Sequence, residues 1–232
     1  MMSRIVVQIY SMTSPEEAAM VSSLGADHVG MMVWLKETHL PILSVQDARK
    51  VARGVEGSSK VVIIPTTHDI GEIIEIVEKV DPDYVQITSY PNYLSFESFV
   101  LLSEKLRSGG TRVIRVIPVN GHKSLEMALL YERHCDVIMT DSAGKPPFPH
   151  VRGFIGGTGK THNWMISADI RKRIKKPLIL AGGLSPENVA AAIKEVLPWG
   201  IDAASSLNLE GTCKKDPEKV KAFIEAVRSI RG

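Results

Sequence analysis

Short apolar runs alternate along the chain with longer amphipathic stretches. The runs have the length of buried strands and are rich in valine and isoleucine, as strands covered on both faces are. Eight strands are expected, at residues 4–10, 28–33, 60–64, 84–87, 112–119, 136–140, 177–181 and 202–207. The interruptions between them are long enough for a helix in every case.

Residues typical of helix starts precede the amphipathic stretches. A serine or aspartate with an open side-chain oxygen, often followed by proline, stabilises the first turn of a helix. The expected starts are Ser14, Ser44, Asp69, Ser95, His122, Ile166, Ser185 and Asp216. Continuous apolar strands joined by helices indicate a parallel sheet, and eight such units favour an α/β fold of the (β/α)₈ TIM barrel type over an open doubly wound sheet.

Composition supports one domain spanning residues 1–232. The chain has 232 residues, 44% of them hydrophobic, and no Pro/Ser-rich or low-complexity tract that would mark a linker. The formal net charge is +2, with acidic and basic residues interspersed. This even distribution argues against nucleic-acid binding, whereas a pI near 8.5 suits small anionic partners.

The cysteines and the N-terminal segment point to an intracellular protein. Cys135 and Cys213 have the spacing of neither a disulfide framework nor a metal site. No apolar stretch approaches 18 residues, and the first residues lack the apolar core of a secretion signal. We expect a cytoplasmic location, no membrane association and no metal.

Two loops at the carboxyl ends of the last two strands favour phosphate binding. In TIM barrels the loops after strands seven and eight usually hold phosphate. Gly182 and Gly183 follow the seventh strand and allow close approach of backbone N–H groups, and Ser185 marks the start of a helix with a positive end. Ser205 and Ser206 follow the eighth strand and add small donors.

A glycine-rich flap, residues 153–164, follows a strand that ends in Asp141. A nucleotide P-loop would require glycine at position 154, which is Phe154, and the flap is therefore not a P-loop. A flap beside a carboxylate at a strand end indicates a small-molecule site, with Gly156, Gly157 and Lys160 as binding candidates. The Asp141 carboxylate either belongs to this site or caps the following turn.

Together these segments resemble the phosphoribosylanthranilate isomerase family of tryptophan biosynthesis. The likeness covers nearly the whole chain. The matching segments are Tyr84-Val85-Gln86, Asp141-Ser142, the flap from Gly156 to Trp164, the stretch from Pro177 to Val189, Gly200-Ile201-Asp202, Ser205-Ser206 and the stretch from Lys215 to Val220.

The resemblance implies a cofactor-free Amadori rearrangement, in which an N-glycosidic aldose phosphate opens and isomerises to an aminoketose phosphate. It implies a phosphorylated small-molecule substrate, a monomer or homodimer, and a general acid at Asp141. Arg115 agrees with the family's fifth strand, and both a ligand contact and a structural pairing are open for it. Lys160 in the flap would meet phosphate or carboxylate.

Two positions depart from the family pattern. The family ends strand one with Lys-Ile-Cys-Gly and uses the thiol as general base, whereas this chain has Gln8-Ile9-Tyr10-Ser11. Tyr10 at the thiol position is a candidate for the base, and its alternative role is to fill the barrel mouth or to hydrogen-bond a ligand. The family's Ser-Pro-Arg after strand two is absent: alignment from the strand puts His39 at the arginine position and alignment from Ser44 puts Pro41 there, and His39 is a poor bidentate substitute. His68 and His122 are further candidates for the base.

The departures predict that turnover of phosphoribosylanthranilate is absent or far below that of an ordinary family member. The alternatives are a barrel acting on another phosphorylated sugar, or a binding paralogue without catalysis. A Schiff-base aldolase is a further rival, but Lys36 and Lys160 lie in loops and neither stands out as its reactive lysine.

Overall fold

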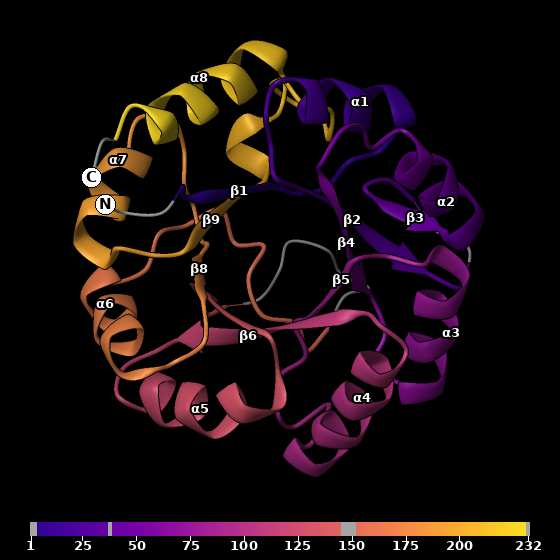
Figure 1. Cartoon of the computed structure of the whole chain (residues 1–232), viewed down its shortest axis with the longest axis vertical. Coiled ribbons are helices and arrows are strands. Elements are labelled where there is room, and N and C mark those ends of the chain that lie inside the picture. The colour runs from indigo at the N-terminus through magenta and orange to yellow at the C-terminus, as the bar shows by residue number, and fades with distance from the viewer. Residues whose placement is uncertain (1–3, 37–38, 145–151, 231–232) are drawn as a thin grey trace.

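The computed structural model describes residues 4–36, 39–144 and 152–230, which form a closed parallel barrel surrounded by helices (Figure 1). The strands are β1 (Val6–Ile9), β2 (His28–Trp34), β3 (Ile42–Ser44), β4 (Lys60–Pro65), β5 (Tyr84–Ile87), β6 (Arg112–Val119), β7 (Val137–Ser142), β8 (Leu178–Leu180) and β9 (Gly200–Ala203). Pairing runs β1-β9-β8-β7-β6-β5-β4-β2 and closes between β2 and β1. The expected TIM barrel is confirmed.

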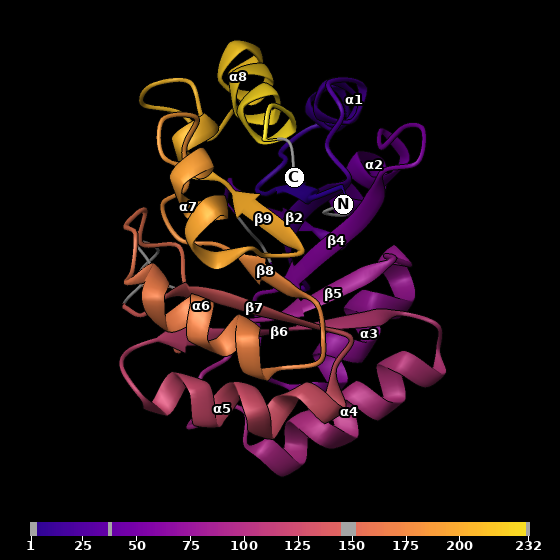
Figure 2. The ribbon, with the colours of Figure 1, turned by 60° about the vertical axis from the view of Figure 1, so that its left-hand side comes forward.

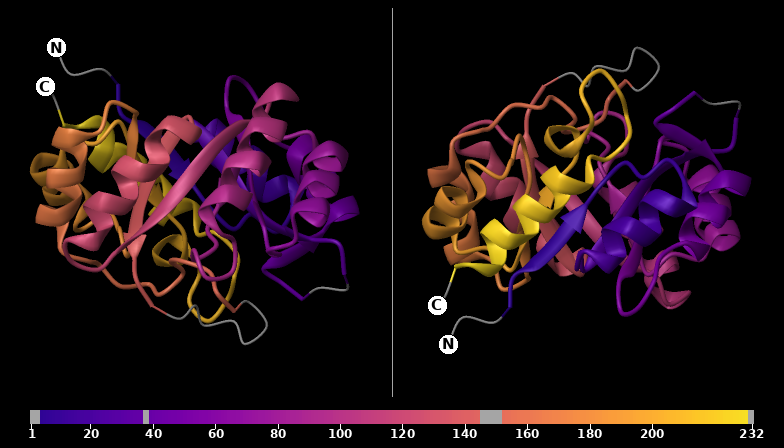
Figure 3. Two further views of the ribbon diagram at one scale, coloured as in Figure 1. Left: turned by 90° about the horizontal axis from the view of Figure 1, so that it is seen from below. Right: turned by 90° about the horizontal axis from the view of Figure 1, so that it is seen from above.

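The helices follow the strands around the outside of the barrel. They are α1 (Pro15–Ser23), α2 (Val45–Arg53), α3 (Ile70–Val80), α4 (Phe96–Ser108), α5 (Lys123–Tyr131), α6 (Trp164–Arg173), α7 (Val189–Val196) and α8 (Pro217–Arg228). Figure 2 shows α4 to α6 lying side by side against the outer face of the strands. In both views of Figure 3 the start of β1 lies near the end of α8, where Arg228 donates to the carbonyl of Ile5.

Side-chain oxygens cap five of the helices at the expected residues. Ser14, Ser44, Asp69, Ser95 and Asp216 each accept an N–H from the first turn. Helix α6 begins two residues earlier than expected, after Asn163, and α7 begins at Val189, four residues beyond Ser185. The Asn188 side chain accepts the Ser185 N–H and so stabilises the turn formed by residues 185–188.

Apolar side chains pack in two layers, one between the strands and helices and one inside the barrel. The interior layer includes Tyr10, Ile114, Val116 and Met139. Buried polar side chains also form a hydrogen-bonded row from His28 through Gln8 to Gln86, and both hydrogen bonds are 3.0 Å long. Such buried polar groups are stable because each finds a partner.

The structure differs from the sequence expectation at two strands. The short strand β3, which the sequence did not predict, pairs with the C-terminal half of β2 and leads into α2. The last barrel strand spans Gly200–Ala203 instead of 202–207, because Ser205–Leu207 turn into a short 3₁₀ helix. This shift changes which end of the barrel Asp202 occupies.

Candidate functional site

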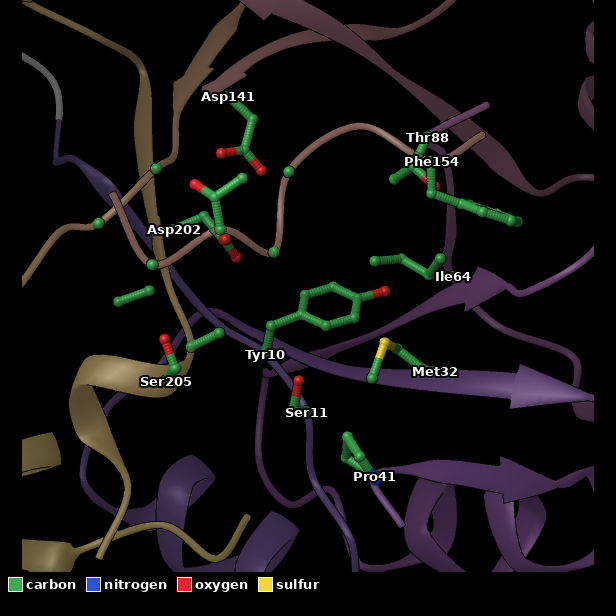
Figure 4. Close-up of a pocket in the computed structure, with 18 of the residues that line it drawn as sticks. Tyr10, Ser11, Met32, Pro41, Ile64, Thr88, Asp141, Phe154, Asp202 and Ser205 are labelled. Atoms are coloured by element: carbon green, nitrogen blue, oxygen red, sulfur yellow. The ribbon is translucent and has the colours of Figure 1, made fainter. Parts of the chain in front are cut away.

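A cavity of about 310 Å³ opens at the carboxyl ends of the strands, the size of a small-ligand pocket. Figure 4 shows its two unlike ends. Asp141, Asp202 and Ser205 lie at one end, whereas Met32, Ile64 and Phe154 lie at the other. The ring of Tyr10 lies between the two groups. The pocket therefore offers a polar half and an apolar half to a single ligand.

Open backbone N–H groups line the polar half. Gly182 and Gly183 both have positive φ, 89° and 61°, which turns the chain away from β8. Among the described residues, no hydrogen-bond acceptor pairs with the N–H of Gly182, Gly183 or Ser205. The Ser205 hydroxyl also lines the pocket, whereas the Ser206 hydroxyl donates to the Leu184 carbonyl. Unpaired backbone donors on two adjacent loops suit an anion such as phosphate.

Asp141 lies at the end of β7, directly under the flap. Its Oδ1 accepts the N–H of Ser142 at 2.6 Å, and Ser142 Oγ pairs with Thr158 of the flap. A Cβ built on Gly156 would overlap the Asp141 carboxylate, so only glycine lets the flap cover it. Desolvation raises the pKa of Asp141 to about 6 against the lowering effect of the Ser142 hydrogen bonds. Asp141 can therefore hold a proton close to neutral pH.

Asp202 is a site residue that the sequence analysis missed. It is the third residue of β9, pairs in register with Gln8 of β1, and lines the pocket. Its Oδ1 is enclosed and has no hydrogen-bond partner among the described residues. Desolvation and then repulsion from Asp141 raise its pKa to about 7, against weaker opposing effects of Gln8 and Lys215. Two carboxyl groups with raised pKa thus share the polar half.

Tyr10 occupies the pocket centre because Gly30 makes room for its ring. A Cβ on Gly30 would overlap that ring. The Tyr10 hydroxyl is buried without a partner, and burial followed by the charge of Asp202 raises its pKa well above its usual value. A general base must lose its proton near neutral pH. This environment opposes the role of base that we considered for Tyr10.

The flap is held in place by the loop that follows β5. The N–H of Ile155 donates to Thr88 at 2.8 Å, and the N–H of Tyr90 donates to Gly153 at 2.8 Å. His68 fixes the same segment from the side, because its ring nitrogens pair with Ser89 Oγ and with the Arg152 carbonyl, both at 2.8 Å. His68 therefore braces the flap and does not line the pocket.

Arg115, for which a ligand contact and a structural pairing were both open, does not line the pocket. Its neighbours in β6, Ile114 and Val116, point into the barrel, so Arg115 points outward. The guanidinium donates to the carbonyl of Ser89 at 2.8 Å and stacks on Tyr131, with 4.4 Å to the ring centre. These contacts favour the structural pairing over a ligand contact.

Two further binding candidates also lie away from the main pocket. Lys160 is exposed and lines a separate hollow with His162 and Ser142, although its neighbour Gly159 faces the pocket. His39 is exposed in the loop before β3, where Pro41 lines the pocket instead. Both Gly156 and Gly157 of the flap do line the pocket. His122 precedes α5, is exposed and does not line the pocket.

Neither a metal centre nor a membrane span is found in the described part of the chain. Over residues 4–36, 39–144 and 152–230, no three His, Cys, Asp or Glu side chains are grouped to hold a metal ion. None of the helices within these ranges has both the length and the apolar character needed to cross a bilayer.

The chain is similar to known proteins over almost its full length. The family model of N-(5'phosphoribosyl)anthranilate (PRA) isomerase matches residues 7–226. A Methanocella arvoryzae protein named N-(5'-phosphoribosyl)anthranilate isomerase is 35% identical, covering 96% of this chain and 97% of the relative. The solved phosphoribosyl anthranilate isomerase of Thermotoga maritima superposes with a TM-score of 0.78 at 28% identity, covering 97% and 100% of the two chains.

A second solved structure carries a ligand of direct interest. It is a phosphoribosyl anthranilate isomerase in complex with reduced 1-(o-carboxyphenylamino)-1-deoxyribulose 5-phosphate, with a TM-score of 0.76 at 25% identity, covering 97% of this chain and all of that one. The family model and the Methanocella arvoryzae relative each match nearly the whole of the chain. The chain belongs to the N-(5'-phosphoribosyl)anthranilate isomerase family.

Proposed function

We propose that this protein isomerises N-(5'-phosphoribosyl)anthranilate to the corresponding 1-amino-1-deoxyribulose 5-phosphate. The observation that carries the proposal is the divided pocket, with free N–H donors and two carboxyl groups at one end and apolar side chains at the other. A phosphorylated pentose fits the polar half, and an aromatic ring fits the apolar half.

The phosphate belongs between the loops after β8 and β9. The open N–H groups of Gly182, Gly183 and Ser205, with the Ser205 hydroxyl, supply donors for its oxygens. The pentose then extends toward Asp141 and Asp202. This orientation directs the amine substituent across Tyr10 toward Met32, Ile64 and Phe154.

An aromatic acid is also compatible with the charges beyond the apolar half. A neighbouring hollow shares Thr66 and Phe154 with the pocket and carries the cationic side chains of Lys36 and Arg152. Lys36 Nζ lies 5.4 Å from the Trp34 ring centre. These cations stand in for the missing arginine as partners of a carboxylate, through single charges instead of a bidentate fork.

Asp141 acts as the general acid in this proposal. It protonates the furanose ring oxygen, the bond from that oxygen to C1' breaks, and the nitrogen lone pair forms the C1'=N bond. A pKa of about 6 keeps part of the group protonated near neutral pH. The sequence expectation of weak turnover rested on the missing thiol and arginine, and nothing in the comparisons favours another substrate.

A fluorescence assay that follows loss of the anthranilate substrate tests the function. We expect measurable turnover by the wild-type protein and a 10²–10⁴-fold lower kcat for Asp141→Asn, with a small change in KM, because the loss of one acid–base group has about this effect. Asp81→Asn is the control, since Asp81 is exposed at the end of α3, where its left-handed backbone suits asparagine equally well. Absence of wild-type turnover, or full activity of Asp141→Asn, would contradict the proposal.

A further inference from the structure

The isomerisation needs a second proton transfer, and the family's thiol that performs it is absent. We propose that Asp202, placed on β9 beside the end of β1, is the general base that removes the proton from C2' of the opened substrate. This inference rests on the function proposed above. It gives the reaction an acid from β7 and a base from β9 within one pocket.

The position of Asp202 in the sheet supports this role. Strand β9 is the barrel neighbour of β1, and Asp202 pairs in register with Gln8, two residues before Tyr10. Side chains two residues apart on a strand face the same side, so Asp202 and Tyr10 both point into the barrel. The carboxyl group therefore approaches, from the adjacent strand, the region where the family places its thiol.

The other ionisable groups in reach do not meet the requirement. Among the described residues that line the pocket, the remaining ionisable side chains are Tyr10, Asp141 and Cys213. Burial holds Tyr10 protonated, and Asp141 is already the proton donor. Cys213 lies in the loop after β9, past Asn208, and is tested below as the competing base.

The surroundings of Asp202 suit a base that works near neutral pH. Its Oδ1 is enclosed and has no hydrogen-bond donor among the described residues, so this oxygen is open to accept a proton. Enclosure and the neighbouring Asp141 both raise its pKa. Because both carboxyl groups have a raised pKa, one of them can carry a proton close to neutral pH while the other accepts one, as an acid and a base in one pocket require.

The proposed step balances without a further reactant. Asp202 takes the proton from C2', the C–H electron pair forms the C1'=C2' bond, and the electron pair of the C1'=N bond returns to nitrogen. The resulting enol amine becomes the ketose when C1' gains a proton and the C2' hydroxyl loses one. Each proton taken up is matched by one released, as an isomerisation demands.

The test measures kcat, KM and the isotope effect of C2'-deuterated substrate for the wild type, Asp202→Asn and Asp202→Glu. We expect Asp202→Asn to lower kcat by about 10²–10⁴-fold with a small change in KM, and Asp202→Glu to recover part of the loss. Slower removal of the C2' proton must also increase the isotope effect on kcat. Asp81→Asn again serves as the folded, active control.

Further variants separate this assignment from its rivals. Asp141→Asn should suppress the isotope effect, because ring opening then limits the rate; the opposite pattern in the two variants would reverse the roles of acid and base. Loss of turnover in Cys213→Ser with retention in Asp202→Asn would move the base to the thiol. An active wild type with an active Asp202→Asn overturns this inference alone, whereas an inactive wild type overturns the proposed function and this assignment with it.

Discussion

The ring of Tyr10 fills the middle of the pocket, and its hydroxyl makes no hydrogen bond. We predict that Tyr10→Phe keeps kcat within about threefold of the wild type, because a hydroxyl with a strongly raised pKa takes no part in proton transfer at neutral pH. Removing a buried, unpartnered hydroxyl should also leave the free energy of unfolding unchanged or raise it by about 1 kcal/mol.

Steady-state kinetics and urea unfolding of the Tyr10→Phe protein check this prediction. The informative comparison is Tyr10→Ala, which removes the ring and leaves a cavity beside Gly30. We expect Tyr10→Ala to lose stability and to raise KM. A hundredfold fall of kcat in Tyr10→Phe alone would return the hydroxyl to the chemistry.

Single residues differ in how far the sequence reveals their role. The position of Asp141 at a strand end beside the flap was readable, because burial patterns mark where a strand stops. Arg115 was not, since alternation had to be counted from Ile114 and Val116 to show that it faces the helices. Asp202 was missed because an expected strand start at residue 202 put it at the opposite end of the barrel.

At the scale of elements, the flap depends on one close approach. Gly156 has φ of 86°, and any side chain there would overlap the Asp141 carboxylate. We predict that Gly156→Ala lowers kcat at least tenfold, because the flap and the carboxylate can no longer occupy their present positions together. Kinetics at saturating substrate measure the effect.

Gly57→Ala provides the matched control for the flap variant. Gly57 also has positive φ, 65°, but a Cβ there would meet nothing within 4 Å, and the residue lies between α2 and β4, away from the pocket. We expect a stability loss of about 1 kcal/mol from the backbone strain in both variants, and a loss of kcat in Gly156→Ala only. Equal activities would show that the close approach at Gly156 has no role in catalysis.

Helix starts were predictable where a serine or aspartate stands at the N-cap position. Ser14, Ser44, Asp69, Ser95 and Asp216 cap helices at the expected places, because a short side-chain oxygen has one geometry that satisfies the first turn. The start of α7 was not predictable. There the Asn188 side chain accepts the Ser185 N–H and donates to the Gly183 carbonyl. These hydrogen bonds form a turn where a helix start was expected at Ser185.

At the scale of the whole molecule, folding of the barrel buries two carboxyl groups, Asp141 and Asp202, that are solvated in the unfolded chain. Their raised pKa values mean that the folded protein binds protons more tightly than the unfolded chain at these positions. Stability is therefore given up for a pocket that combines acid and base, as is common at active sites. The size of this loss depends on pH.

The sign follows from proton binding. Between about pH 4, near the usual pKa of an aspartate, and pH 7, the folded-state pKa of Asp202, the folded protein keeps a proton that the unfolded chain has lost. The contribution of Asp202 to stability must therefore fall as pH rises through this window and then level off. The two pKa values differ by about three units, and each unit corresponds to about 1.4 kcal/mol. The free energy of unfolding therefore falls by about 4 kcal/mol across the window.

We therefore predict that Asp202→Asn is nearly as stable as the wild type at pH 4.5 and more stable by up to about 4 kcal/mol at pH 8. Apart from Asp141, whose charge interacts with that of Asp202, the other groups titrate alike in both proteins, so the difference reports Asp202 together with its coupling to Asp141. Urea unfolding of both proteins at several pH values measures it, with Asp81→Asn as a variant expected to show no such trend. A constant difference across pH would mean that Asp202 has the same pKa in the folded and unfolded states, and it would contradict the raised pKa that its enclosure implies.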